Sequence, residues 1–375
     1  MGGFIGPFVA VIARDRLHAS PMLLGLMMAA PFIGNLFALF WANAMEGKSK
    51  LPFVVFSMIA SRSIYILMVF AVTPGPYAAI IFAASILSTI ASPAYAAVMN
   101  DVYAKRIRGR AMGYARVCTV SAHIVAVAVA GPLLYRLGPY GYRWVFPVAA
   151  LVGIYSSLIF KRIKTSEVEP VERTRLREFL LNSAMILRDD RPFRWFALSI
   201  FTAGFGTLTV LPLYPIFQVD TLHITTTQVS VIANVGALTT VLAFLFWGPF
   251  IDKRTPLKGA AISVFLITAT PLTYAFARHW TMLLPAAAIQ GVANAGVELS
   301  YFNTILRFSP PERVSHYQAV FVSLLGVRGT IAPLLGTALM ERNVVGMQTL
   351  FLAAAALCLV SVALQVYGTR THTVR

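Results

Sequence analysis

The sequence predicts an all-α membrane protein that crosses the bilayer many times and is built from two halves of six helices each. Three observations predict this fold class. The chain has 375 residues, of which 58% are hydrophobic and only 12% charged, whereas a soluble domain has about 25% charged residues. Apolar segments long enough to cross a membrane follow one another along the chain. The first half of the sequence also recurs in the second half.

Twelve apolar segments can be drawn from the hydropathy pattern. Most of them are close to the ~20 residues with which a helix spans a bilayer. Their approximate ranges are 2–14, 21–45, 51–73, 77–99, 111–136, 142–160, 193–217, 226–250, 258–277, 280–306, 315–340 and 345–367. The first range is short for a span, because its residues rise only ~20 Å along a helix against a hydrocarbon core of about 30 Å.

The two halves repeat each other at offsets of 203 to 206 residues, and such small changes of offset are what loop insertions produce. Subtracting 205 from the start of the seventh segment, near Phe193, places the start of the first segment about twelve residues before Met1. We therefore expect the first helix to be truncated at its N-terminus. The alternative is a true half-helix, whose end needs polar partners at membrane depth. The repeated residues are Pro7, Asp15, Leu17, His18, Asn100, Arg110 and Tyr114, which return as Pro212, Asp220, Leu222, His223, Asn303, Arg313 and Tyr317.

The loops between the segments alternate in charge. One set contains 23 of the 31 Lys and Arg residues, and the other set contains six. Because Lys and Arg concentrate in cytoplasmic loops, the first set is predicted to be cytoplasmic, together with both termini. We expect a six-helix half at 1–160, a cytoplasmic linker at 161–192 and a second six-helix half at 193–375. The linker is either an amphipathic helix on the membrane surface or a solvated connection.

The stretch DVYAKRIRGRAMGYAR, residues 101–116, holds five cations and two glycines. In a soluble protein it would suggest a nucleic-acid patch. Here it is the cytoplasmic turn between the fourth and fifth segments, so we expect contact with anionic lipid headgroups and no nucleic acid. Its counterpart in the second half keeps only one arginine at the entry to the next span, followed four residues later by a tyrosine. Arg110 and Arg313 are therefore the cations for which we expect a role in conformational change.

Short motifs lie near the predicted span ends. GPFIDKR at 248–254 has a glycine, an aspartate and two basic residues, and its first-half counterpart ANAMEGKSK has Ala42 and Glu46 in place of the glycine and the aspartate. RGRAMGY and YRWVF stand at the entries to the fifth and sixth segments. Together with the two six-span halves, these motifs resemble the major facilitator superfamily of membrane transporters, and the resemblance covers nearly the whole chain. It implies two halves that rock about a central site.

The resemblance also implies a conformational latch at these motifs. A carboxylate beside basic residues at a helix end can pair or separate as neighbouring helices shift. The alternative is a charge cluster that only fixes topology. Two features of drug exporters are incomplete, because segment 77–99 has no arginine and Gly131-Pro132 is only a fragment of the antiporter motif. The latch candidates are Asp252, Lys253, Arg254, Glu46, Arg110 and Arg313.

Polar side chains lie on one face of the tenth segment. Gln290, Asn294 and Glu298 are spaced at i, i+4 and i+8, with Tyr301 close to the same stripe. Glu298 lies nine residues before Arg307, so the helical rise places Glu298 ~14 Å into the membrane. Because charges inside a membrane are costly, we expect this stripe to face a wet cavity in which Glu298 carries a proton. In the superfamily, the first, fourth, seventh and tenth spans line the central cavity.

Three further residues are candidates for solute or proton contacts. Arg328 lies inside the eleventh segment, and its guanidinium needs an acceptor, either Glu298 or an anionic solute. His123 lies in the middle of the fifth segment, where it either relays protons or bonds to a neighbouring helix. Tyr95 continues a row of hydroxyl residues in the fourth segment, although such residues also let membrane helices pack closely.

The sequence predicts a secondary transporter that moves a small solute by alternating access, with proton-coupled export as the favoured mode. The alternatives are an uptake permease and a transporter-fold protein without transport, such as a sensor or an assembly partner. An enzyme is not expected, because no GxxxxGK[ST], no GxSxG and no metal-spaced histidine cluster occurs. We expect no cofactor and no metal, and a monomer in the bilayer of a bacterial inner membrane. Cys118 and Cys358 are expected to be small core residues.

Overall fold

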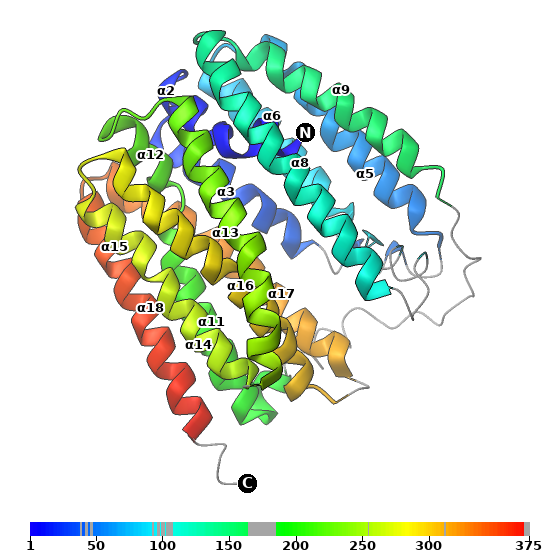
Figure 1. Ribbon diagram of the computed structural model, residues 1–375, viewed down its shortest axis with the longest axis vertical. Helices are drawn as coiled ribbons and strands as arrows, with labels where there is room; N and C mark the ends of the chain where they lie inside the picture. The colour runs from blue at the N-terminus through cyan, green and yellow to red at the C-terminus, as the bar shows by residue number, and fades with distance from the viewer. Residues whose placement is uncertain are drawn as a thin grey trace. The chain divides into compact units, whose positions relative to one another are not determined.

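The computed structural model is built from helices (Figure 1). It describes residues 1–37, 40–41, 44–45, 48–91, 94–95, 98, 102, 108–163, 185–253, 255–310 and 313–370, with the backbone alone for 108–114, 116, 252, 315 and 368–370. Every regular element in those residues is an α-helix or a short 3₁₀-helix. The chain divides into two compact units. They are Met1–Leu176 with Thr225–Ser230, and Arg177–Ile224 with Val231–Arg375.

The helices of the first unit follow the first six predicted segments. Their bounds are α1 Gly2–Ile5, η1 Gly6–Phe8, α2 Val9–Asp15, α3 Pro21–Leu36, α5 Leu51–Ile64, η2 Tyr65–Phe70, α6 Pro74–Thr89, α8 Arg108–Arg136 and α9 Tyr142–Phe160. The first segment is a broken run, in which η1 interrupts the helix at Pro7. Within this unit α3 packs against α6, α1 packs against α8, and α5 contacts both α6 and α9. Figure 1 shows α5 and α9 side by side.

The helices of the second unit follow the last six predicted segments. Their bounds are α11 Arg191–Val210, α12 Leu213–Asp220, α13 Thr226–Lys253, α14 Pro256–Ile267, α15 Ala269–Phe276, η3 Trp280–Met282, α16 Leu283–Phe308, α17 Val314–Glu341 and α18 Met347–Arg370. α11 packs against α17 and α18, and α14 packs against α16 and α18. The core of this unit contains Phe193, Phe196 and Ile200 of α11 together with Tyr301 and Tyr317.

Nine helical stretches among the described residues are long and apolar enough to cross a membrane. α3 and α6 are shorter apolar helices, and the second and fourth predicted segments continue past them into residues outside the described part. Each of the twelve predicted segments contains a helix. The all-α fold class is therefore confirmed.

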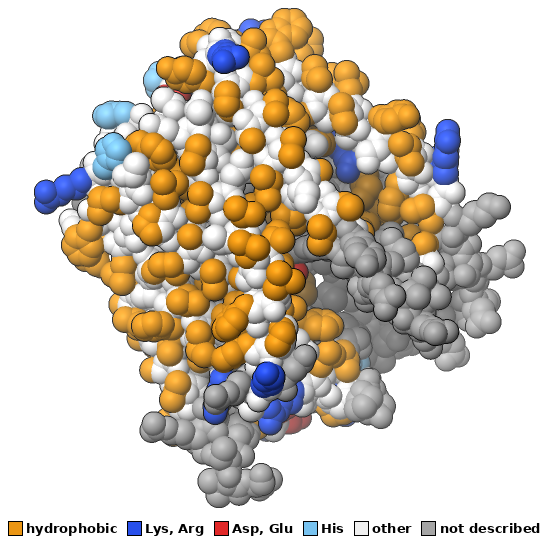
Figure 2. Space-filling view, viewed as in Figure 1, with side chains coloured by type: hydrophobic (Ala, Val, Ile, Leu, Met, Phe, Trp, Pro, Cys, Tyr) orange, Lys and Arg blue, Asp and Glu red, His pale blue; other side chains and the backbone are white. Residues whose placement is uncertain are grey.

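The outward faces of the helices are apolar. Phe56, Trp144 and Leu245 are among the large hydrophobic side chains that lie more than half exposed. In Figure 2, hydrophobic side chains are spread across the described surface of the face in view. Apolar area on this scale is unfavourable in water but not against lipid tails, which are as apolar as the side chains. The surface is that of an integral membrane protein.

The internal repeat extends to the backbone of one turn. His18 and His223 both have positive φ, 51° and 49°, a conformation that histidine adopts more readily than most residues. Such turns bond the carbonyl groups that a helix end leaves without partners. The repeat is therefore one of conformation as well as of sequence. The same three backbone N–H···O bonds close both turns: Arg16, Leu17 and Ala19 donate to Ile12, Ile12 and Ala13, as Thr221, Leu222 and Ile224 donate to Phe217, Phe217 and Gln218.

The helix that follows each turn begins with the same kind of cap. Ser20 Oγ accepts a hydrogen bond from Leu23 N at 3.2 Å, and Thr225 Oγ1 accepts one from Gln228 N at 3.3 Å. A hydroxyl at this position gives an acceptor to a backbone N–H that has none within the helix. Ser20 and Thr225 are 205 residues apart but differ in type, so a comparison of identities alone does not detect this pair.

Close packing joins α11 to α17 in the second unit. A Cβ added at Gly336 of α17 would overlap the backbone carbonyl oxygen of Thr209 on α11. A helix backbone cannot move aside as a side chain can, so only glycine fits at this approach. Small residues at such points let membrane helices gain van der Waals contacts.

Gly336→Ala is expected to lower the free energy of unfolding by about 1–3 kcal/mol, because the added methyl group forces α11 and α17 apart. The measurement is denaturant unfolding of the purified protein in detergent. The matched control is Gly248→Ala in α13, where an added Cβ meets no atom within 4 Å, and this change should be neutral or stabilising. Equal stability of the two variants would contradict the close approach.

Candidate functional site

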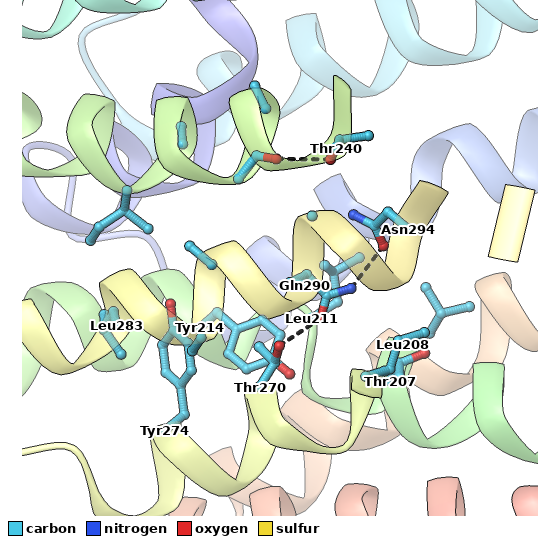
Figure 3. Close-up of a pocket in the computed structure, with 18 residues that line it drawn as sticks. Thr207, Leu208, Leu211, Tyr214, Thr240, Thr270, Tyr274, Leu283, Gln290 and Asn294 are labelled. Atoms are coloured by element: carbon cyan, nitrogen blue, oxygen red, sulfur yellow. Dashed lines mark hydrogen bonds between the residues drawn. The ribbon is translucent and has the colours of Figure 1, made fainter. Parts of the chain in front are cut away.

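The second unit contains a cavity of about 650 Å³ (Figure 3). This volume lies within the ~300–1,000 Å³ typical of small-molecule sites. The α11–α12 junction, α13, α14–α15 and α16 form its walls. The lining residues are Thr207, Leu208, Leu211, Tyr214, Ile232, Ala233, Gly236, Ala237, Thr240, Ile267, Thr270, Tyr274, Leu283, Ala286, Ala287, Gln290, Gly291 and Asn294. We call it the second-unit cavity.

A row of hydrogen-bonded side chains lies along the wall of the second-unit cavity. Thr270 Oγ1 donates to Gln290 Oε1 at 2.6 Å, and Gln290 Nε2 donates to Asn294 Oδ1 at 2.8 Å. Gln290 and Asn294 meet because residues four apart lie on the same face of a helix. We call Thr270, Gln290 and Asn294 the amide relay. Figure 3 shows both bonds of the relay as dashed lines.

The amide relay leaves hydrogen-bond donors available. A side-chain amide has two N–H donors, so Asn294 Nδ2 keeps both of its protons and Gln290 Nε2 keeps one. Two threonines in the cavity wall have their hydroxyl protons in use and their oxygen lone pairs available. Thr207 Oγ1 donates to Gly204 O at 3.2 Å, and Thr240 Oγ1 donates to Gly236 O at 2.8 Å, so each hydroxyl has lone pairs left. The cavity therefore offers both donors and acceptors.

The opposite end of the second-unit cavity is aromatic and apolar. Leu283, Tyr214 and Tyr274 lie toward one end in Figure 3, and Asn294 lies toward the other. The rings of Tyr214 and Tyr274 have their centroids 4.4 Å apart. Tyr214 is stacked on Phe351, with 5.5 Å between centroids and 7° between ring planes. Packing on these neighbours fixes the orientation of the Tyr214 ring.

The structure separates the predicted stripe of the tenth segment into three environments. Gln290 and Asn294 line the second-unit cavity. Glu298 is exposed one turn further along α16 and is not among the lining residues. Tyr301 was expected on the same wet stripe but is buried in the core, with its ring 5.7 Å from that of Phe196. Helical spacing places residues on one face, but the neighbouring helices decide which part of that face is covered.

Arg328 is buried in the second unit, with 7% of its surface exposed. Its Nη1 donates to the backbone carbonyl of Ile200 on α11, and its Nε has no hydrogen-bond partner. A Cβ at Gly204 would overlap the guanidinium, so this glycine makes room for the charge. The predicted partner for Arg328 was Glu298. The acceptor that the structure shows is a backbone carbonyl, and the pairing with Glu298 stays a prediction.

The first unit contains a second, smaller cavity of about 380 Å³. Its polar lining residues include Ser57, Ser61, Arg62, Ser85 and Ser88. Arg62 Nη1 donates to Gly153 O and Ser157 Oγ on α9. Arg62 therefore bonds to groups of a neighbouring helix.

The other two candidates of the first unit do not line this cavity. His123 is half-buried on α8, where its backbone carbonyl lies against Gly3 of α1. Tyr95 is exposed, and its ring is stacked on Phe160 with 6.0 Å between centroids. Neither residue lines the second-unit cavity. A solute or proton contact of His123 or Tyr95 therefore stays a prediction.

The latch candidates are only partly described by the structure. Glu46 and Arg254 lie outside the described residues, as do the side chains of Asp252 and Arg110. Lys253 is exposed at the end of α13. Arg313 is exposed beside α17 and lines a small pocket together with Asp189 and Asp190.

The sequence did not predict a polar contact that joins the ends of α11 and α17. Tyr317 donates its phenolic proton to Asp190 Oδ2 at 2.7 Å, and Asp190 Oδ1 accepts from Phe193 N at 2.9 Å as the cap of α11. Tyr317 is buried, with 6% exposed. Two signals were present in the sequence: an aspartate directly before Arg191-Pro192, where a helix can start, and the repeat of Tyr114 as Tyr317.

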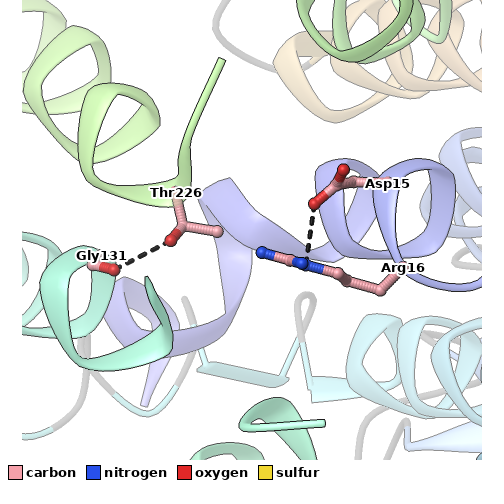
Figure 4. Close-up of polar contacts among 4 residues, drawn as sticks. All are labelled: Asp15, Arg16, Gly131 and Thr226. Carbon is pink, nitrogen blue, oxygen red and sulfur yellow. Dashed lines mark hydrogen bonds and ion pairs between the residues drawn. The ribbon is translucent and has the colours of Figure 1, made fainter. Parts of the chain in front are cut away.

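A polar contact in the first unit involves the predicted antiporter fragment. Thr226 Oγ1 donates to Gly131 O at 3.0 Å (Figure 4). Gly131 packs so closely that a Cβ there would overlap Ser230. Figure 4 also shows the ion pair of Arg16 with Asp15 at 2.8 Å, which is partly exposed. An ion pair of this kind contributes little stability, at most about 1 kcal/mol.

Comparison with protein families gives a match over nearly the whole chain. The Major Facilitator Superfamily model matches residues 1–270 and 196–374. A curated relative from Buchnera aphidicola subsp. Schizaphis graminum (strain Sg), named an uncharacterized transporter, is 22% identical over 158 residues. That match covers 41% of this chain and 38% of the relative, so it spans well under half of that protein.

Solved structures with the same fold include several transporters. The nucleoside transporter NupG has a TM-score of 0.73 at 14% identity, covering 98% of this chain and 95% of that one. A bacterial homologue of the human lysosomal transporter Spinster, inward-facing and unoccupied, has 0.68 at 15% identity, covering 98% and 94%. The human organic anion transporter MFSD10 has 0.63 at 14% identity, covering 97% of both chains. At such identities the likeness is one of fold.

Gly204→Ala is expected to cost about 1–3 kcal/mol of unfolding free energy, because the methyl group displaces the Arg328 guanidinium. The cost should fall by roughly 1 kcal/mol or more in an Arg328→Met background, where no guanidinium needs the space. Denaturant unfolding in detergent of the wild type, both single variants and the double variant measures the coupling. Equal costs in the two backgrounds would show that Arg328 does not occupy this site.

Tyr317→Phe is expected to lower the unfolding free energy by about 1–2 kcal/mol, because a hydrogen bond to a carboxylate is lost while the ring contacts remain. Tyr155→Phe is the control, since Tyr155 is 67% exposed on α9. The same unfolding experiment compares the two. If the loss at Tyr317 is no larger than the loss at Tyr155, the contact with Asp190 contributes nothing.

Proposed function

The chain belongs to the Major Facilitator Superfamily, and on that premise we propose that it is a secondary transporter that moves a small solute across the membrane by alternating access. The single observation that carries the proposal is the second-unit cavity with its amide relay. A helix that only faced lipid would not keep a row of amides, because polar groups there lack water. A cavity of this size and polarity instead suits a solute.

The family and its structural neighbours indicate a transporter rather than an enzyme. A transporter-fold protein without transport has less support, because a sensor or an assembly partner does not need a polar cavity of this kind. As a transporter, the protein has the lipid bilayer and the solute as its partners. We place it in the inner membrane of a bacterium as a monomer. The distribution of Lys and Arg supports cytoplasmic termini.

Proton-coupled export is our proposal for the transport mode. Glu298 is an exposed carboxylate one turn of α16 beyond Asn294, so it can exchange protons with water close to the solute. A carboxylate that binds a proton loses its charge and with it much of the cost of moving into an apolar environment. Protonation of Glu298 would thus favour a reorientation that the charged form resists. An uptake permease, proton-coupled or facilitated, is the alternative mode.

The contact between Tyr317 and Asp190 suggests how the second unit takes part in the cycle. It joins the ends of α11 and α17, and Arg313 lines the same small pocket as Asp190. Contacts of this kind can form in one state and break in another as helices shift. We propose Arg313 and Asp190 as latch residues of the second half, together with the predicted Asp252, Lys253 and Arg254.

Glu298→Gln is expected to reduce gradient-driven solute flux to nearly the rate seen without a gradient, because glutamine cannot carry a proton. The measurement is flux of a panel of solutes in proteoliposomes with and without a pH gradient. Glu341→Gln is the control, since Glu341 is an exposed carboxylate at the end of α17. Gradient-driven flux that survives in Glu298→Gln would remove Glu298 from the coupling, and no flux of any solute in the wild type would contradict transport.

A further inference from the structure

We propose that the second-unit cavity is selective for an uncharged amphipathic solute, one that has a flat apolar ring at one end and a carbonyl or hydroxyl group at the other. This inference rests on the proposed function and names the class of solute. It follows from three properties of the cavity, which are its charge, its unused hydrogen-bonding groups and its aromatic end.

The described lining of the second-unit cavity contains no Asp, Glu, Lys or Arg. A charged group that leaves water for an apolar site costs several kcal/mol unless an opposite charge receives it. Two charged residues that the sequence suggested as solute contacts, Glu298 and Arg328, are not part of this lining. Glu298 lies one turn of α16 beyond Asn294, and Arg328 is bonded to the carbonyl of Ile200. A neutral solute avoids this cost, whereas an anion or a cation does not.

The unused hydrogen-bonding groups at the polar end specify what the solute carries. Asn294 keeps two N–H donors and Gln290 keeps one, because each amide has two and only one of the four, on Gln290 Nε2, donates within the amide relay. These donors need an acceptor, such as a carbonyl or a hydroxyl oxygen. The hydroxyl oxygens of Thr207 and Thr240 donate to their own helices and are left as acceptors. A solute with hydroxyl or N–H groups next to a carbonyl satisfies both kinds of partner.

The apolar end is shaped for a ring. Tyr214 and Tyr274 form a corner with their ring centroids 4.4 Å apart, and Leu283 lies at the same end (Figure 3). Tyr214 is held by its stacking on Phe351, and Tyr274 Oη accepts from Gln218 Nε2 at 2.6 Å. Rings that neighbours hold in place lose little entropy when a ligand packs on them, and aromatic groups prefer offset or edge-to-face contact.

The test uses three compounds that share one unsubstituted phenyl ring and differ in charge: phenylacetamide, phenylacetate and phenethylamine. Binding to the purified full chain in detergent is measured by calorimetry at pH 7. The neutral amide should bind at least about tenfold more tightly than the anion or the cation, which corresponds to about 1.4 kcal/mol. Equal or tighter binding of a charged compound, or binding of none of the three, would overturn the proposal.

Asn294→Asp supplies the second arm of the test, because it replaces the amide donors by a carboxylate at the polar end. We expect the neutral amide to bind at least about tenfold less tightly to this variant and phenethylamine at least about tenfold more tightly. Asn303→Asp is the matched control on α16, since Asn303 Nδ2 bonds to Leu299 O and does not line the cavity. An unchanged order of affinities in Asn294→Asp would also overturn the proposal.

Flux in proteoliposomes distinguishes a failure of the solute class from a failure of the transport proposal. If the wild type transports a charged solute as fast as its neutral analogue, transport stands and the class is wrong. If the neutral amide binds in the cavity but no solute crosses the membrane, the class stands and transport is wrong.

Discussion

The hydrocarbon core of a bilayer supplies no hydrogen-bond partners, and the polar side chains of this protein are arranged around that constraint. Thr270, Gln290 and Asn294 bond to one another within the wall of a cavity. Arg62 and Arg328 each bond to a backbone carbonyl of a neighbouring helix. Many threonine and serine hydroxyls of the described residues, such as those of Thr209, Thr239 and Ser263, donate to the carbonyl three or four residues earlier in their own helix. A few amide N–H donors and hydroxyl lone pairs in the cavity have no partner within the described part of the protein, and a solute can bond to them.

Glycine makes several of these arrangements possible. A buried guanidinium fits against α11 because residue 204 has no side chain, and α17 approaches the α11 backbone because residue 336 has none. Because the hydrophobic effect does not drive helices together within lipid, membrane helices gain stability from the van der Waals contacts of such close packing. The same feature that stabilises the second unit therefore also gives Arg328 its place.

The sequence alone determined the fold class, the order of the helices and one part of the candidate site. Composition and helical length follow directly from the bilayer, so the all-α membrane fold could be predicted. The spacing of Gln290 and Asn294 placed them on one face of a helix, and the structure shows both in the cavity. The repeat of His18 as His223 was visible as an identity, and its cause is the shared left-handed turn.

The tertiary structure decided what each polar residue contacts. Tyr301 has the same helical phase as Gln290, yet α11 and α17 cover that end of the face and bury it. Arg328 has Ile200 O as its acceptor, and Tyr317 meets Asp190 across 127 residues of sequence. Tyr214 and Tyr274 form the apolar end of the cavity although no pattern in the sequence links them. Helical periodicity fixes only the direction in which a side chain points, whereas its partner depends on how distant segments pack.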